Sequence, residues 1–516
     1  MKKIVLLIIY MISLWVHAQI DTSLVKHIVK VDDHPSQFIS PSLLSAIETP
    51  QFNDSTFRRI YFIHGLGGDA SSWQQASDAC WDQTLNISGF FARNVEISRP
   101  EYIYSTLTTL NSAAYDVRQQ IRNQSFIDYY QNNMNPNAAI MIGHSQGGLI
   151  IRSLVHMDLQ PNANIPALGK GYGGFITVAS PLQGAQIINN RSQIEQMAHD
   201  ACNCLLKGPE TSNIAIHTIL KIMGKDQVND NVCNLIASNI LPLFFSQYYD
   251  NITNDYKVGA SAIQQFNNDV NFTSYQTMPK LAIYGIEPRE NILWRTANWL
   301  IKNPNSAPPF GANDDWEFFN TTIYPTYMSY VSNVCIYRSR VEILAGSQYI
   351  LFPFLTPGMH LATLFLMNDY INKMRAWQTG VDWFNRANAN WETIIGARQY
   401  VVNQTTYYYC RKCTIGQSWF ISPTLQPCLD CNCREVRAIP TQTVTYTLAA
   451  NDGIVIAESA SNLPGATHCP LRISCSDVSG YDGSSHMQIR NDSYLERSFH
   501  NLFEGEYGMF FKLKRK

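Results

Sequence analysis

One serine in this chain lies in a setting that could make its hydroxyl a nucleophile. Ser145 is at the centre of GHSQG, residues 143–147, which is a G-x-S-x-G pattern. The apolar run 139–142 precedes it, and apolar residues at helical spacing follow it. In such a pattern the serine occupies a sharp turn from strand to helix. A Cβ atom on either of the two glycines would clash with this turn. The sequence predicts an exposed hydroxyl at a helix N-terminus; the alternative is a turn whose serine only caps the helix.

A histidine near the C-terminus is the candidate base. A serine hydroxyl is a poor nucleophile until a base removes its proton. His486 lies on a small polar stretch ahead of a predicted helix at 493–503, which gives it the mobility of a loop residue. The other histidines of this region are His468, beside a cysteine, and His500, inside that predicted helix. We predict His486 as the base.

The base in turn needs a carboxylate that holds its tautomer and stabilises the imidazolium. Asp452 comes shortly after a strand-like stretch at 443–448, and the ends of strands are where a parallel sheet presents functional groups. Glu287 and Glu290, which follow another predicted strand at 280–285, are rival acids. Asp452 could also be only the acceptor of a local Asp-Gly turn. Given the serine motif, we predict Asp452 as the acid.

A glycine-rich loop is the candidate oxyanion site. HGLGG, residues 64–68, directly follows a β-branched and aromatic strand at 58–63. Such a loop lets backbone N–H groups approach a ligand. An ordinary strand-to-helix turn explains the same residues equally well.

The elements that must position these residues alternate between strand and helix. Apolar runs without alternation are typical of strands buried on both faces of a parallel sheet. The predicted strands are 58–63, 95–104, 139–142, 174–179 and 280–285, and the predicted helices include 71–81 and 112–130. The pattern predicts an α/β protein with a mostly parallel central sheet and helices on both faces.

Two segments interrupt this alternation. Residues 186–277 are helical and irregular in pattern, and residues 287–440 are rich in aromatic side chains and cysteines. Within the second segment, the apolar run 349–367 contains Pro353 and Pro357, which argue against a continuous membrane-spanning helix. The run could line a lid or an acyl-binding groove, but we favour the core of an inserted subdomain.

The N-terminus is typical of a secretory signal peptide. Lys2 and Lys3 precede an apolar run at 4–16, and Ala18 ends a stretch suited to cleavage. We expect residues 1–18 to be removed and the mature protein to be secreted or periplasmic. In an oxidising compartment the twelve cysteines would form disulfides.

Five of these cysteines form a cluster with close to zinc-ribbon spacing. The cluster consists of Cys410, Cys413, Cys428, Cys431 and Cys433. Its first four members could hold a structural zinc ion, but export favours disulfides. Five cysteines cannot all pair among themselves, so at least one must reach elsewhere, and Cys469 and Cys475 are candidates.

The composition limits the kinds of partner. The chain has 516 residues with 38 basic and 40 acidic side chains, and the net charge of −2 gives no reason to expect nucleic acid or an anionic membrane surface. Hydrophobic residues make up 45%, enough for a sizeable core.

These motifs resemble those of secreted bacterial triacylglycerol lipases, serine hydrolases of the α/β-hydrolase fold. The similar stretches are HGLG at 64–67, GHSQGG at 143–148, ASPLQG at 179–184, NDGIV at 451–455, and His486. The resemblance implies Ser145 as nucleophile, Asp452 as acid and His486 as base. It also implies an oxyanion hole formed by the backbone N–H groups of Leu66 and Gln146.

The resemblance also implies a domain organisation. Residues 19–286 and 441–516 would form the hydrolase domain, with a helical lid at about 186–277 and the aromatic, Cys-rich segment 287–440 inserted before the acid. Gln488 stands where the family usually has an acidic residue that helps to hold calcium, so calcium is not expected. No other cofactor is expected.

The function predicted on this basis is a secreted serine ester hydrolase, a lipase or esterase, that cleaves carboxylic esters of lipids through an acyl-enzyme on Ser145. Its partners would be an acyl ester and, transiently, a lipid interface. An acyltransferase, thioesterase or amidase could use the same residues, and a non-catalytic secreted binding protein could keep the same scaffold.

Overall fold

The computed structural model describes fourteen segments of the chain. They are residues 22–24, 58–66, 68–81, 87–88, 90–95, 109–206, 253–268, 278–287, 291–301, 319–351, 356–410, 436–464, 466–471 and 484–515. The expected signal peptide at 1–18, the rival acid Glu290 and four of the five clustered cysteines, those at 413, 428, 431 and 433, lie outside the described residues.

A six-stranded sheet forms the centre of the molecule, and every neighbouring pair of its strands is parallel. The strand order is β3-β1-β4-β5-β6-β9. The strands are β1 (Arg58–Ile63), β3 (Phe90–Val95), β4 (Ile140–His144), β5 (Gly174–Val178), β6 (Lys280–Gly285) and β9 (Thr467–Leu471). The expectation of a mostly parallel sheet is confirmed; of the strand predicted at 95–104 only Val95, the last residue of β3, lies within the described residues.

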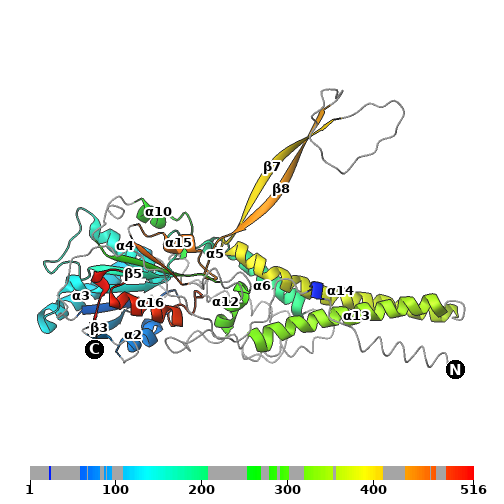
Figure 1. Ribbon diagram of the computed structural model, residues 1–516, viewed down its shortest axis with the longest axis horizontal. Coiled ribbons are helices and arrows are strands. Elements are labelled where there is room, and N and C mark those ends of the chain that lie inside the picture. Colours follow the sequence, from blue (N-terminus) through cyan, green and yellow to red (C-terminus); the bar gives the residue numbers. More distant parts are fainter. Residues whose placement is uncertain are drawn as a thin grey trace.

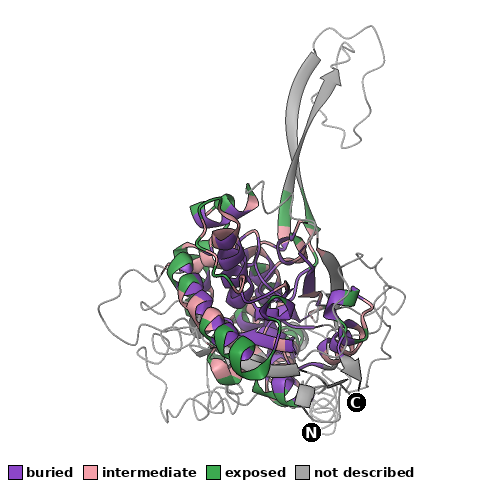
Figure 2. Cartoon of the chain, turned by 90° about the vertical axis from the view of Figure 1, so that its left-hand side faces the viewer, coloured by how far each residue is buried: buried purple, intermediate pink, exposed green. Residues whose placement is uncertain are grey.

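Helices cover both faces of this sheet (Figure 1). Alternate residues of each strand point to opposite sides, so Tyr61 and Met141 pack against α3 and α4, whereas Phe62 and Ile142 belong to a second cluster with α2 and α16. The flanking elements are η2 (Ala70–Trp73), α2 (Gln74–Trp81), α3 (Leu110–Asn132), α4 (Gln146–Leu159) and α16 (Ser493–Glu504). The described side chains of β1, β4, β5 and β6 are mostly apolar and buried, because both faces of these strands are covered (Figure 2).

The described part of the first interruption is helical. It contains α5 (Gln186–Asn189), α6 (Arg191–Leu206) and α10 (Ser261–Asn267). Residues 207–252 and 269–277 of the expected lid lie outside the described residues.

The second interruption forms a long helical hairpin that runs away from the sheet (Figure 1). Its helices are α13 (Tyr324–Leu351) and α14 (Pro357–Ile394), preceded by α12 (Ile292–Ile301) and the π-helix η5 (Phe319–Ile323). Near the sheet domain the hairpin has an aromatic core that includes Trp294, Tyr330, Trp377, Phe384 and Trp391. Thr356 caps α14 by accepting the Met359 N–H at 3.4 Å, and Pro357 occupies its first turn, so the helix begins at this proline, while Pro353 lies outside the described residues.

One expectation about this hairpin is wrong. The stretch placed in the core of the subdomain is exposed where the structure describes its side chains: Phe365 is 67% and Leu361 is 55% accessible. Among the described residues, none of the helices combines the length and the apolar character that crossing a membrane needs.

A second expectation needs correction. The stretch 443–448 is a strand, but it belongs to β8 (Val436–Leu448), which pairs antiparallel with β7 (Arg398–Cys410) in a separate two-stranded ribbon. This ribbon projects from the body of the molecule (Figures 1 and 2). Asp452 therefore does not follow a strand of the central sheet. The remaining short elements are η1 (Thr22–Leu24), β2 (Ile87–Ser88), η3 (Pro136–Ala138), α15 (Ala457–Ser461), η7 (Met509–Phe511) and β10 (Lys514–Arg515).

Candidate active site

The turn between β4 and α4 presents Ser145 in a strained conformation. Its φ of 51° and ψ of −118° lie in a region that side chains rarely adopt. The flanking glycines allow the turn, because a Cβ on Gly143 would lie 2.5 Å from the Gly147 carbonyl carbon, and one on Gly147 would lie 2.4 Å from the Ile63 oxygen. Strain of this kind costs on the order of 1–3 kcal/mol and is typical of functional turns.

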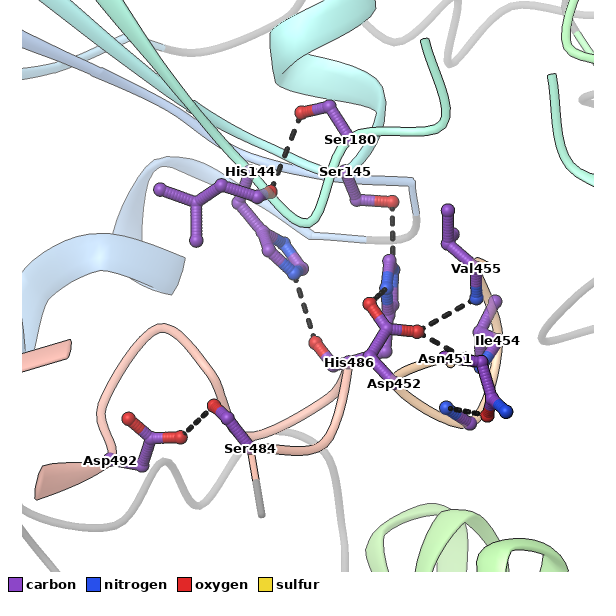
Figure 3. A network of polar contacts seen from close by, with 12 residues as sticks. His144, Ser145, Ser180, Asn451, Asp452, Ile454, Val455, Ser484, His486 and Asp492 are labelled. Atoms are coloured by element: carbon purple, nitrogen blue, oxygen red, sulfur yellow. Dashed lines mark hydrogen bonds and ion pairs between the residues drawn. The ribbon is translucent and has the colours of Figure 1, made fainter. Parts of the chain in front are cut away.

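The three residues predicted to act together do lie together. The Nε2 atom of His486 is 3.0 Å from the Ser145 hydroxyl oxygen, and its Nδ1 atom is 2.8 Å from Oδ2 of Asp452 (Figure 3). Asp452 and His486 are almost fully buried, with 1% and 5% of their surface accessible. Because an ionised carboxylate can only accept, Nδ1 donates to Asp452, which leaves the Nε2 lone pair facing the serine.

Asp452 is held by its own loop. Its Oδ1 atom accepts the backbone N–H groups of Ile454 at 3.1 Å and Val455 at 2.7 Å (Figure 3). The backbone N–H of His486 donates to the Asp452 carbonyl at 2.8 Å, so the acid and base loops are joined directly. A Cβ on Gly285, the last residue of β6, would lie 2.1 Å from the Ser484 oxygen and 3.0 Å from the Asp452 Cβ. Both loops therefore meet at the C-terminal end of β6.

The rival acid Glu287 faces a different partner. Its carboxylate lies 2.6 Å from Nε of Arg295, and both side chains are buried. Its backbone N–H donates to the Asn451 carbonyl at 2.6 Å, next to the acid. Glu287 thus supports the loop that carries Asp452, while Asp452 itself contacts the base.

The expected oxyanion loop lies against the serine. A Cβ on Gly65 would come within 3.0 Å of the Ser145 Cβ, so the backbone after β1 passes directly beside the nucleophile. Gln146 is the first residue of α4, where helix N–H groups have no acceptor within the helix. Leu66 is the next residue of this loop, and Gly67 lies outside the described residues.

His144 is a residue of the site that the sequence analysis did not assign. Its Nε2 atom is 3.0 Å from the backbone oxygen of His486, and the two rings are 5.0 Å apart (Figure 3). Burial, which disfavours the charged form, holds the pKa of His144 well below its usual value, so the ring is neutral and donates from Nε2. In the sequence, the available indication of this role was that His144 stands directly before Ser145 in the G-x-S-x-G motif.

Replacing His144 with phenylalanine is expected to lower kcat about tenfold with KM unchanged, because the base loses a restraint on its backbone rather than a contact with substrate. His144→Gln, whose amide can still donate, should recover part of the rate. Steady-state kinetics of both variants check this. Equal losses in the two variants, or a change in KM alone, would contradict a positioning role.

Asp492 anchors the loop that carries His486. It accepts a hydrogen bond from the Ser484 hydroxyl (Figure 3) and caps α16 through the Leu495 N–H at 2.8 Å. Burial raises the pKa of Asp492 to about 7, with Arg295 opposing the shift. Its protonated form is therefore favoured by folding, and this contribution is complete below about pH 4 and lost as the pH rises through 7.

The variant Asp492→Asn should remove this pH dependence while keeping the helix cap, since asparagine caps as well as aspartate. We expect the free energy of unfolding of the wild type, relative to the variant, to fall by on the order of 4 kcal/mol between about pH 4 and pH 8. Denaturant unfolding at several pH values measures the difference. A constant difference across this range would show that Asp492 does not titrate in the folded protein.

The described residues offer no site for a metal ion. Within the segments that the structure describes, no group of three or more His, Cys, Asp or Glu side chains has a suitable arrangement. Cys335 is buried in the hairpin core. The side chains of the four cysteines predicted as possible zinc ligands lie outside the described residues.

The chain is similar to known hydrolases. Residues 59–283, less than half of the chain, match the family model of palmitoyl protein thioesterase. The match begins within β1, includes the serine turn and ends within β6, before Asp452 and His486. A comparison with curated proteins gave no match.

Solved structures give low scores. Phospholipase PlaB from Legionella pneumophila aligns at 11% identity with a TM-score of 0.25, over 45% of this chain and 40% of that protein. The lipase BlEst2 from Bacillus licheniformis aligns at 15% identity with a TM-score of 0.25, over 56% of this chain and 52% of that protein. A monoglyceride lipase from Saccharomyces cerevisiae aligns at 13% identity with a TM-score of 0.25, over 49% of this chain and 80% of that protein. The chain thus covers about half or less of the first two proteins.

The family match, with the strand order of the parallel sheet and the serine turn after β4, identifies the fold of this chain as that of the α/β-hydrolases.

Proposed function

We propose that this protein hydrolyses acyl esters or acyl thioesters through a covalent acyl-enzyme on Ser145. The observation that carries the proposal is the array of Ser145, His486 and Asp452, joined at 3.0 and 2.8 Å. A buried carboxylate, an imidazole and a serine on a strained turn in this order are the arrangement that activates a hydroxyl.

In the proposed reaction, the Ser145 oxygen attacks the acyl carbonyl while His486 Nε2 takes its proton. Asp452 stabilises the imidazolium that forms. The N–H groups of Leu66 and Gln146 would stabilise the negative oxygen of the tetrahedral intermediate, and losing one such donor costs roughly 3–4 kcal/mol of barrier. His486 then protonates the departing alcohol or thiol, and water, deprotonated by the same imidazole, releases the fatty acid.

Two substrate classes remain as named alternatives. The family model that matches residues 59–283 is that of a thioesterase, which favours a long-chain acyl thioester. The lipase-like motifs favour a carboxylic ester of a lipid. The two classes use the same steps and differ in the leaving group.

A matched pair of substrates separates them. We would compare kcat/KM for palmitoyl-coenzyme A and p-nitrophenyl palmitate, with Ser145→Ala as the blank for each. A preference of more than about tenfold, or 1.4 kcal/mol of transition-state binding, assigns the class. If neither ester nor thioester is cleaved above the blank, the proposed hydrolysis is wrong and a binding protein on this scaffold becomes the better explanation.

We further propose that residues 1–18 direct export and are then removed, and that the clustered cysteines form disulfides without zinc. The mature N-terminus should follow Ala18 by mass spectrometry. Elemental analysis of the purified protein should find less than stoichiometric zinc; a full equivalent would contradict the disulfide proposal.

A further inference from the structure

The outer end of the α13–α14 hairpin exposes large apolar side chains to solvent. We define the hairpin tip as residues 343–348 of α13 and 356–368 of α14. Five large apolar side chains of the tip are between 42% and 67% accessible: Met359, Leu361, Leu364, Phe365 and Leu366. We propose that the hairpin tip inserts into the hydrocarbon of a phospholipid bilayer and holds the hydrolase domain at that surface.

The exposed side chains of the tip do not form a single stripe along α14. His360, Thr363 and Met367 are half-buried on one side of α14. At about 100° per residue, the five exposed side chains cover the rest of the helix circumference. A helix that docks on a protein presents one stripe at i, i+3, i+4 and i+7. Hydrocarbon, in contrast, contacts every exposed side at once.

The sequence of the hairpin tip carries no Asp, Glu, Lys or Arg, from Ile343 through to Asn368. Such residues are the ones that a surface loop or helix in water usually carries, and they are also the most costly to place in a membrane. The tip is therefore suited to hydrocarbon.

Polar side chains of the tip form hydrogen bonds with backbone carbonyl groups of the hairpin itself. The Thr363 hydroxyl donates to the Met359 carbonyl at 2.8 Å, and the Ser347 hydroxyl donates to the Leu344 carbonyl at 2.9 Å. The Gln348 amide donates across the hairpin to the His360 carbonyl at 3.3 Å. Internal bonding of this kind lowers the cost of moving hydroxyl and amide groups out of water.

A belt of charged and aromatic side chains flanks the tip on both helices, at 337–342 and 369–375. The rings of Tyr337 and Tyr370 are 5.8 Å apart, and the Arg340 guanidinium lies 5.0 and 5.5 Å from their centres. Tyrosine and basic residues are enriched where a membrane protein meets the headgroups. The belt residues with charge are Arg338, Arg340, Glu342, Asp369, Lys373 and Arg375. Four basic and two acidic groups give a local charge of +2, which complements lipid phosphates.

The length of the tip agrees with insertion into one leaflet. Tyr370 lies eleven positions after Met359, a rise of about 16.5 Å at 1.5 Å per residue, compared with about 15 Å for half of a bilayer core. Figure 1 shows that the hairpin points away from the sheet, so insertion would leave the hydrolase domain in water. The proposal of binding rests on the tip alone; only its purpose, access to acyl lipids, rests on the proposed function.

Flotation with vesicles of phosphatidylcholine containing a minor share of phosphatidylglycerol tests the proposal. We expect wild type and Ser145→Ala to float equally with the vesicles, also at high salt, which weakens purely electrostatic adsorption. The double variant Leu364→Glu/Phe365→Glu should partition at least about tenfold more weakly. Both positions are exposed, so the folded domain should keep its unfolding midpoint and its rate on a soluble short-chain ester.

The matched control is Tyr115→Glu/Phe126→Glu on α3, where the side chains are 54% and 58% accessible. This variant should float like the wild type. Absence of flotation in the wild type, equal flotation of the tip variant, or an equal loss in the α3 control would each overturn the proposal. So would a wild-type dimer in gel filtration that the tip substitutions convert to monomer, since a second copy would then cover the tip. Hydrolysis of the soluble ester is measured separately, so a failure of catalysis is distinguishable from a failure of binding.

Discussion

Ser145→Ala is expected to lower kcat toward an acyl ester or thioester by about 10⁵-fold, because no other group at the turn can form the acyl-enzyme. The fold should survive, since alanine removes only a hydroxyl from a turn whose conformation is set by Gly143 and Gly147. Rates on p-nitrophenyl palmitate and palmitoyl-coenzyme A measure the loss. A fluorophosphonate probe should label the wild type and leave the variant unlabelled.

An exposed serine provides the control for this prediction. Ser112 lies in the first turn of α3, and Ser112→Ala should keep the wild-type rate and labelling. Undiminished activity or labelling in Ser145→Ala would refute the assignment of the nucleophile. Absence of labelling in the wild type would favour the binding-protein alternative.

Asp452→Asn is the second substitution with a large expected effect, a loss of about 10⁴-fold in kcat, as observed when the acid of a serine protease triad is replaced by its amide. The amide would donate to His486 Nδ1 and so favour the wrong tautomer. The Nε2 atom would then carry the proton and could not accept the one on Ser145. Single-turnover kinetics should show the loss in acylation, while substrate binding changes little.

Glu287→Gln is the matched comparison. It neutralises a buried carboxylate that lies 2.6 Å from Arg295, so its main effect should be a stability loss of about 3–5 kcal/mol. Folded Glu287→Gln protein should retain far more activity than Asp452→Asn. If the glutamate variant instead loses the larger share of kcat while remaining folded, the assignment of the acid must be exchanged.

The parallel strands and their helices were readable from local pattern. The expected strands at 58–63 and 280–285 coincide with β1 and β6, because a strand buried on both faces carries a run of apolar residues, here 60–63 and 281–284. The serine turn was equally legible, since its steric demand for glycine is local. The order of serine, acid and histidine along the chain then limited the possible partners.

Strand 443–448 shows where local pattern misled. Its residues form a strand, but the pattern does not say which strand it pairs with, and β7 is the partner. The choice between Asp452 and Glu287 likewise depended on contacts between loops about 160 residues apart, which meet at Gly285. The restraint of His486 by His144, across 342 positions, has no local signature either.

By itself, then, the sequence determined the class of fold, the nucleophile turn and a short set of partners, because these follow from side-chain volume, backbone sterics and chain order. Only the tertiary structure decided which carboxylate contacts the base and that the described part of the apolar run, residues 356–367, is largely exposed. Burial is a property of packing between distant segments. An apolar run can therefore be a core, a groove or, as at the hairpin tip, a surface open to its surroundings.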